Sequence, residues 1–88
     1  MFVWHVVRGA NGRVELVDGW ESLDALIAEM ATSSWEEPGN AWASYVTDDS
    51  SGDVVVVALF GPGMELLVAA SDGRQLRFPV PEFYREQP

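Results

Sequence analysis

One stretch of this chain repeats its apolar residues at helical spacing, and the remaining ordered segments are patterned as strands. Five apolar residues recur with the period of an α-helix: Trp20, Leu23, Leu26, Ile27 and Met30. The helix is expected to begin with Asp18 as its N-cap and Glu21 as the partner in a capping box. It is expected to end between Ala31 and Ser33, before the Pro38-Gly39 break. A helix this short cannot cover a broad sheet, so the strands determine the rest of the fold.

Six short segments are rich in apolar and β-branched residues and are separated by turn residues. They are Phe2–Arg8, Arg13–Val17, Ala41–Thr47, Val54–Phe60, Met64–Ala70 and Arg74–Val80. The order strand-strand-helix-strand-strand-strand-strand predicts an α+β fold, with an antiparallel sheet of five to six strands and one helix packed on a face. At 88 residues the chain is long enough for one domain, residues 1–88, in which 81–88 form a loosely ordered tail.

The strand at Val54–Phe60 is apolar at every position, which predicts a central strand covered on both faces. One helix leaves part of a six-stranded face uncovered. Either the sheet curves strongly or some apolar surface remains for a partner, and the apolar residues on both sides of the strands favour the partner. Among the aromatic residues, Trp4 and Trp20 are assigned to the core, and Trp42 and Tyr45 fall on opposite faces of their strand.

Charge is strongly segregated along the sequence. The sixty residues between Arg13 and Arg74 contain twelve acidic side chains and no Lys or Arg, and the whole chain has a net charge of -9. A field of this sign repels nucleic acid and anionic lipid and attracts cationic protein surfaces. The expected partner is therefore a basic protein, with no direct binding of nucleic acid or membrane.

No motif for catalysis or for a cofactor is present. The chain has no Cys and one His, and His5 lies within a strand, where a packed or half-exposed residue is the expected role. Asp48, Asp49 and Asp53 lack the terminal bidentate Glu of a calcium loop, so a solvated hairpin tip is favoured over a metal site. We therefore expect no enzyme activity, no cofactor and no metal. No signal peptide or membrane span is evident, and a cytoplasmic location is expected.

Two groups of residues are candidates for binding a partner. Trp35 is an apolar anchor flanked by Glu36 and Glu37, a combination typical of a hot spot against a basic surface. The alternative is that Trp35 folds back over the end of the helix to close the core. The densest acidic cluster is the hairpin tip. The predicted partner-binding residues are Trp35, Glu36, Glu37, Tyr45, Asp48, Asp49 and Asp53.

The pattern over residues 14–80 resembles a known family. The stretch from Val14 to Ile27 leads from a strand into an acidic, Leu-rich helix, and the strands Val54–Leu59 and Glu65–Val68 follow. This arrangement is similar to the immunity proteins of bacterial polymorphic-toxin and contact-inhibition systems, in particular to the actinobacterial type in the first-catalogued immunity family. The resemblance implies a protein that binds a cognate toxin domain, often a nuclease or deaminase, and blocks its active site. It assigns a role to no single residue.

Two classes of function are favoured, and a third, an enzyme or small-molecule binder, would require a deep pocket with convergent polar groups. The first is a non-enzymatic inhibitor that occupies the cationic cleft of a nucleic-acid-acting protein, either as an immunity protein or as a phage-encoded DNA mimic that inhibits a host defence protein. The second is an oligomerising interaction module in which apolar strands pair the chain into a homodimer or a larger complex.

Overall fold

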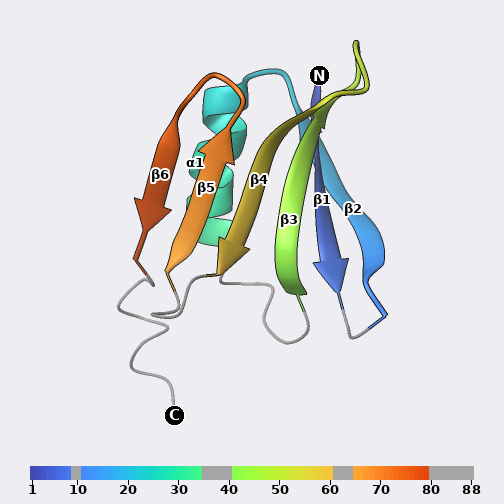
Figure 1. Cartoon of the computed structure of the whole chain (residues 1–88). Helices are drawn as coiled ribbons and strands as arrows, with labels where there is room; N and C mark the ends of the chain where they lie inside the picture. The colour runs from blue at the N-terminus through green and yellow to red at the C-terminus, as the bar shows by residue number, and fades with distance from the viewer. Residues whose placement is uncertain (9–10, 35–40, 61–64, 80–88) are drawn as a thin grey trace.

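The fold is a six-stranded antiparallel sheet with one helix on one of its faces (Figure 1). The computed structural model describes residues 1–8, 11–34, 41–60 and 65–79. The strands are β1 (Phe2–Arg8), β2 (Arg13–Trp20), β3 (Ala41–Asp48), β4 (Val54–Phe60), β5 (Leu66–Ala70) and β6 (Gln75–Phe78), and the helix is α1 (Leu23–Ser33). Their order in the sheet is β2-β1-β3-β4-β5-β6. The predicted α+β fold class is confirmed.

The helix begins four residues later than the sequence pattern suggested, and the predicted capping box is wrong. Ser22 is the N-cap, and its Oγ accepts a hydrogen bond from the backbone N of Ala25 at 3.3 Å. The residues before it continue β2 as far as Trp20, which pairs with Phe2 across the hairpin. Trp20 reaches the core from this strand, with its ring centroid 6.1 Å from that of Trp4. The strand pairing therefore outweighs the fit of Trp20 to the helical period.

The core lies between α1 and the face of the sheet turned toward it. Leu26 and Met30 are fully buried on the helix, at the i, i+4 spacing that places side chains on one face. The strands contribute alternate residues, which is the period of a sheet with one buried face. The buried cluster consists of Trp4, Val6, Leu26, Ile27, Met30, Val46, Val56, Ala58, Leu66 and Val68. The placement of Trp4 in the core is confirmed, and Trp20 packs against the core while half-buried.

Among the residues that the structure describes, no helix lies on the other face of the sheet. Along β4, Val56 and Ala58 are each 1% exposed, whereas Val57 and Leu59 are 45% and 47% exposed. The prediction that this strand is covered on both faces is therefore wrong for the described part of the chain. The sequence showed correctly that both sides of the strand are apolar, but an eleven-residue helix covers only one side.

Candidate interaction surfaces

The face of the sheet that points away from α1 is broad and mostly apolar, and we call it the open face. Directly paired residues of neighbouring antiparallel strands lie on the same side of a sheet, so the strand register defines two rows across this face. One row is Val14, Val7, Ala43, Leu59, Leu67 and Arg77, and the other is Leu16, His5, Tyr45, Val57, Ala69 and Gln75.

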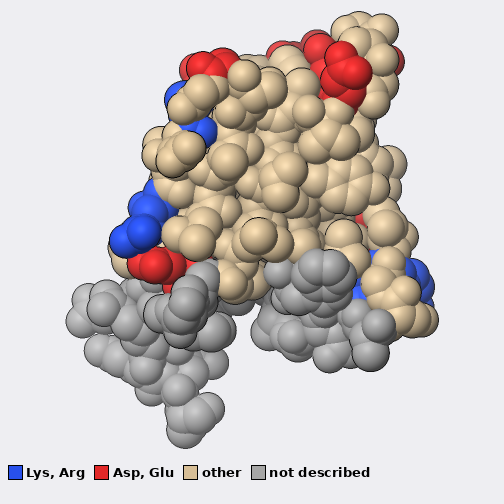
Figure 2. Space-filling view, in the orientation of Figure 1, with Lys and Arg blue, Asp and Glu red and all other residues tan. Residues whose placement is uncertain are grey.

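Neither row contains an acidic side chain. In Figure 1 the helix lies behind the sheet, so Figure 2 displays the open face, with a wide uncharged area over the strands and charged side chains around its margin. Arg77 stands at the β6 end of its row and lies 3.6 Å from a carboxylate oxygen of Glu65. Exposed contiguous apolar surface of this kind marks interaction sites in soluble proteins.

The two halves of the open face differ in relief. On the β2 side, at the edge of the sheet, Val14 and Leu16 are 49% and 65% exposed. On the β4–β6 side, a groove of about 400 Å³ runs over the strands and has Leu59, Leu67 and Ala69 in its lining. The β2 side therefore presents exposed apolar side chains, and the β4–β6 side presents a groove.

Polar side chains in the middle of the open face are paired with each other. The imidazole of His5 stacks on the ring of Tyr45, with centroids 4.7 Å apart and planes inclined by 15°. His5 Nε2 also lies 3.1 Å from Thr47 Oγ1, within hydrogen-bond distance. The expectation of a half-exposed strand histidine is confirmed. Tyr45, a predicted partner-binding residue, is half-buried and belongs to this surface and not to the acidic tip.

Acidic residues gather at one end of the sheet, which we call the acidic end. The register places the end of β2, the start of α1, the β3–β4 loop and the β5–β6 turn there, as Figure 1 shows. Its acidic residues are Asp18, Glu21, Asp24, Asp48, Asp49, Asp53 and Asp72. Two described cationic groups lie among them, the N-terminal amino group and Arg74, so five carboxylates remain in excess.

The acids Asp48, Asp49 and Asp53 lie together as expected from the sequence, Asp48 as the last residue of β3 and the other two in the β3–β4 loop. Asp48 accepts hydrogen bonds from Ser50 Oγ at 2.7 Å and from the Ser50 backbone N at 3.0 Å, which lowers the pKa of Asp48 below its usual value. Asp49 accepts a hydrogen bond from the N-terminal amino group at 3.1 Å and thereby raises the pKa of that amine. The loop is thus a defined structure in which acidic side chains face solvent.

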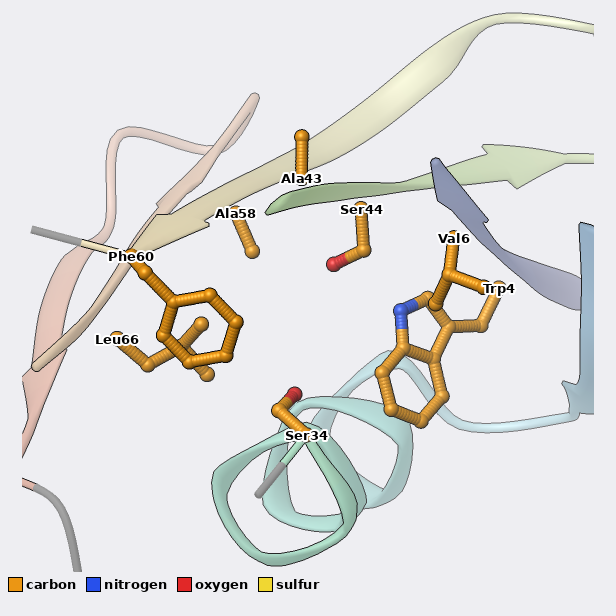
Figure 3. A pocket seen from close by; sticks show the side chains of 8 residues that line it. All are labelled: Trp4, Val6, Ser34, Ala43, Ser44, Ala58, Phe60 and Leu66. Atoms are coloured by element: carbon orange, nitrogen blue, oxygen red, sulfur yellow. The ribbon is translucent and has the colours of Figure 1, made fainter. Parts of the chain in front are cut away.

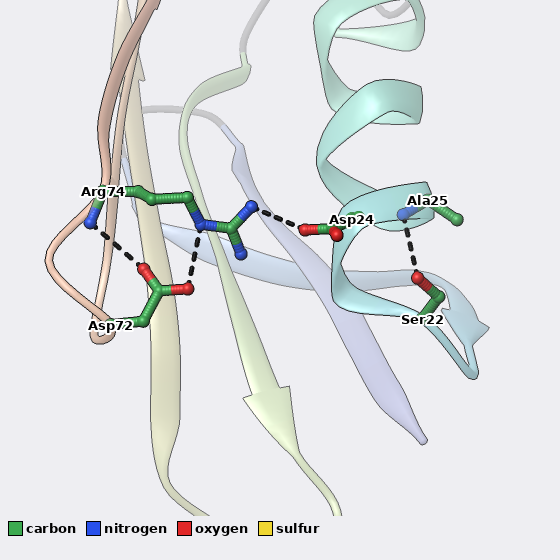
Figure 4. Close-up of polar contacts among 5 residues, drawn as sticks. All are labelled: Ser22, Asp24, Ala25, Asp72 and Arg74. Atoms are coloured by element: carbon green, nitrogen blue, oxygen red, sulfur yellow. Dashed lines mark hydrogen bonds and ion pairs between the residues drawn. The ribbon is translucent and has the colours of Figure 1, made fainter.

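Arg74 ties the β5–β6 turn to the start of the helix (Figure 4). Its Nη1 lies 2.6 Å from Asp24 Oδ1, and its Nε lies 2.9 Å from Asp72 Oδ2. The pKa of the guanidinium is raised, first by the bond to Asp24. The pKa of Asp72 is lowered, first by the hydrogen bond that the backbone N of Arg74 donates. Arg74 therefore bridges two acids of the acidic end and neutralises one negative charge there.

A small cavity lies in the core between the sheet and the end of α1 (Figure 3). It has a volume of about 20 Å³, room for a single water. Trp4 Nε1 points into this space, and neither this nitrogen nor the buried Ser34 Oγ has a hydrogen-bond partner among the described residues. The cavity is too small for an organic ligand, so it is no candidate for a substrate site.

Three of the predicted partner-binding residues, Trp35, Glu36 and Glu37, lie outside the described residues. The structure brings Asp48, Asp49 and Asp53 together and places Tyr45 on a different surface. The apolar character of both sides of the strands indicated that some apolar surface remains for a partner, but sequence reasoning did not name the residues of the open face, such as Leu16 and Leu59. For Val54–Phe60 the same signal was assigned to burial on both faces.

Within the described ranges, no group of three or more His, Cys, Asp or Glu side chains could hold a metal ion. No helix in that part of the chain is long and apolar enough to span a bilayer. No protein-family model, curated protein or solved structure matches this chain. The similarity to immunity proteins therefore stays a prediction from the sequence pattern.

Proposed function

We propose that this chain is a non-enzymatic protein that binds a cationic protein and blocks it, as immunity proteins do with toxin domains. The observation that carries this proposal is the collection of seven acidic side chains at one end of the sheet. A single-signed surface raises the rate of encounter with an oppositely charged partner and selects against partners of the same sign. The nucleic-acid cleft of a nuclease or deaminase is a surface of the required charge.

The structure supports particular residues for this contact. Asp49 is paired with the N-terminus, and Asp24 and Asp72 are paired with Arg74, so their charge is partly neutralised. Asp48 and Asp53 have no ion-pair partner within 4 Å among the described residues. Asp48 ends β3 and Asp53 precedes β4, and the loop between these strands projects beyond the end of the sheet (Figure 1). Asp18 and Glu21 likewise form no ion pair within 4 Å among the described residues, and these four carboxylates are the groups most available to a cationic partner.

Several features favour binding over catalysis. The one histidine is stacked on Tyr45 and hydrogen-bonded to Thr47, on a different surface from the acidic end. General base catalysis by a histidine needs a free ring nitrogen beside a substrate group. The described cavity in the core has room for one water only. An acidic surface without such machinery acts by occupying a site.

The test is capture of basic proteins from the lysate of the native cell, followed by an activity assay of the captured protein. The decisive variant replaces Asp48, Asp49 and Asp53 with Asn. Its matched control replaces Glu15, Glu29 and Glu65 with Gln, three acids outside the acidic end, so that both variants lose the same charge. We expect the first variant to lose capture and inhibition and the control to retain both. Equal loss in both variants would assign the effect to net charge alone, and capture of no basic protein would refute the proposal.

A further inference from the structure

We propose that the open face binds a second copy of this chain, sheet against sheet. This role uses a different surface from the acidic end and stands whether or not the proposed inhibition is correct. Two apolar sheet faces pack about 10 Å apart with interdigitated side chains, as in a β-sandwich. The open face supplies one such layer, and a copy related by a two-fold axis supplies the other.

The distribution of charge permits this contact despite the net charge of -9. The two rows of the open face contain no acidic side chain, and their one charged residue, Arg77, stands at the β6 margin. Negative groups are therefore kept out of the area that two copies would bury. A surface that binds a cationic partner is expected to carry acidic side chains at its centre, whereas the two central rows of the open face carry none.

In a two-fold arrangement, the β2 side of one open face packs over the groove side of the other. A two-fold axis parallel to the strands and between β3 and β4 places β2 over β6 and β1 over β5 of the other copy. Leu16 on β2 then lies over Gln75 on β6, at the groove side of the other copy, and the same contact occurs twice. In the central strands, Tyr45 lies over Val57 of the other copy, so a large side chain meets a smaller one.

The size of the face predicts a dimer near the lower limit of stability. Six strands spaced by about 4.8 Å, with the two complete rows and a partial third row at Val3 and Thr47, give a face of roughly 500 Å² per copy. The two copies together would bury about 1,000 Å², the least that specific interfaces usually bury. We therefore expect a dissociation constant on the order of micromolar or weaker. Because the axis brings both acidic ends to the same side, their repulsion opposes the dimer, and added salt strengthens it.

The experiment is sedimentation of the full chain from about 1 μM to about 1 mM, a range that brackets the expected dissociation constant, at low and high salt. We expect the mass to rise with concentration from 9.7 kDa toward twice that value, and to rise further at high salt. Leu59→Glu places a charge in the buried area and should keep the protein monomeric. Ala28→Glu adds the same charge at an exposed position of the helix and should leave the dimer unchanged. Circular dichroism establishes that both variants are folded.

A mixing experiment tests the face-to-face contact directly. Val57→Glu and Val57→Lys should each be monomeric, whereas an equimolar mixture of the two should associate, because Val57 lies next to the axis and the opposite charges then meet. A monomer at every concentration and salt would overturn the proposal, and so would a dimer that dissociates as salt is raised. A dimer that survives Leu59→Glu would assign association to an edge strand instead. None of these outcomes affects the capture of a basic protein by Asp48 and Asp53, so the two proposals fail independently.

Discussion

The two faces of the sheet are built from the same strands and from similar residue types, yet only one of them is packed. On β4, neighbouring residues alternate between full burial and about half exposure, Val56 and Ala58 on one side, Val57 and Leu59 on the other. The difference arises from the single helix, which supplies Leu26, Ile27 and Met30 to one face. The comparison shows that an apolar strand face indicates a surface that packs against another layer. The strand sequence does not indicate which layer that is. The covered face should govern the stability of the monomer, and the open face should govern association.

The sharpest test of this comparison is one substitution made on each face. Leu26 is fully buried on the helix, and Leu16 is 65% exposed on the open face. Leu26→Ala should lower the free energy of unfolding by about 2–5 kcal/mol, because it leaves a cavity in a packed core. Leu16→Ala should change it by no more than about 0.5 kcal/mol in dilute solution. Urea unfolding at a concentration where the protein is monomeric measures both values, and equal losses would mean that the open face is packed in the monomer.

A second pair of substitutions adds volume in place of removing it. Ala58→Leu inserts a larger side chain into the covered face, where Ala58 is 1% exposed, and should cost about 1–3 kcal/mol. Ala69→Leu adds the same atoms to the groove of the open face and should leave monomer stability within about 0.5 kcal/mol. Filling the groove should also weaken self-association, because Ala69 on β5 faces His5 on β1 of a second copy and a larger side chain no longer fits there. Thermal unfolding and sedimentation of both variants provide the measurements, and an Ala69→Leu protein that dimerises more tightly would contradict the assigned packing.

Much of this architecture could be predicted from the sequence, because each strand is bounded by turn residues and the helical period occurs once. The segments Phe2–Arg8 and Val54–Phe60 form strands with the predicted bounds, and the helix ends at Ser33 within the predicted range. The turn at Asn11-Gly12 was also predictable, because this dipeptide tolerates a positive φ. Gly12 adopts a φ of +68° in the structure.

The incorrect sequence predictions have a common cause. Where a local pattern fits two structures, tertiary contacts determine which one forms. Trp20 fits the helical period, but pairing with Phe2 and contact with Trp4 keep it in β2. Val57 and Leu59 look like core residues, but in the described part of the chain no second layer covers them. For the candidate site, sequence reasoning located the acidic loop but could not separate Tyr45 from it. The register places Tyr45 on the open face beside His5.

The capping of α1 provides a test of smaller magnitude, because the helix forms one wall of the covered face. Ser22→Ala removes the acceptor for the backbone N of Ala25 and should cost about 1 kcal/mol of unfolding free energy. Ser22→Asp keeps an acceptor at the positive end of the helix dipole and should retain most of the stability. Because the open face does not contact α1, neither variant should alter the dissociation constant of the dimer. Chemical denaturation and sedimentation test these two statements separately.

The smallest expected effect concerns the acidic end, which lies at the margin of both sheet faces and outside the hydrophobic core. The pKa of Asp48 is held below its usual value, chiefly by the hydrogen bond from Ser50 Oγ, so the charged form is favoured in the folded protein. A lowered folded pKa contributes stability above the unfolded pKa, near 3.8, and that contribution disappears as pH falls through the folded value. Carboxyl NMR titration of Ser50→Ala should show the pKa of Asp48 rising toward its usual value, while that of Asp72, lowered by Arg74, stays where it is. A parallel rise at both residues would mean that the general field of the acidic end, and not the local loop structure, sets the two pKa values.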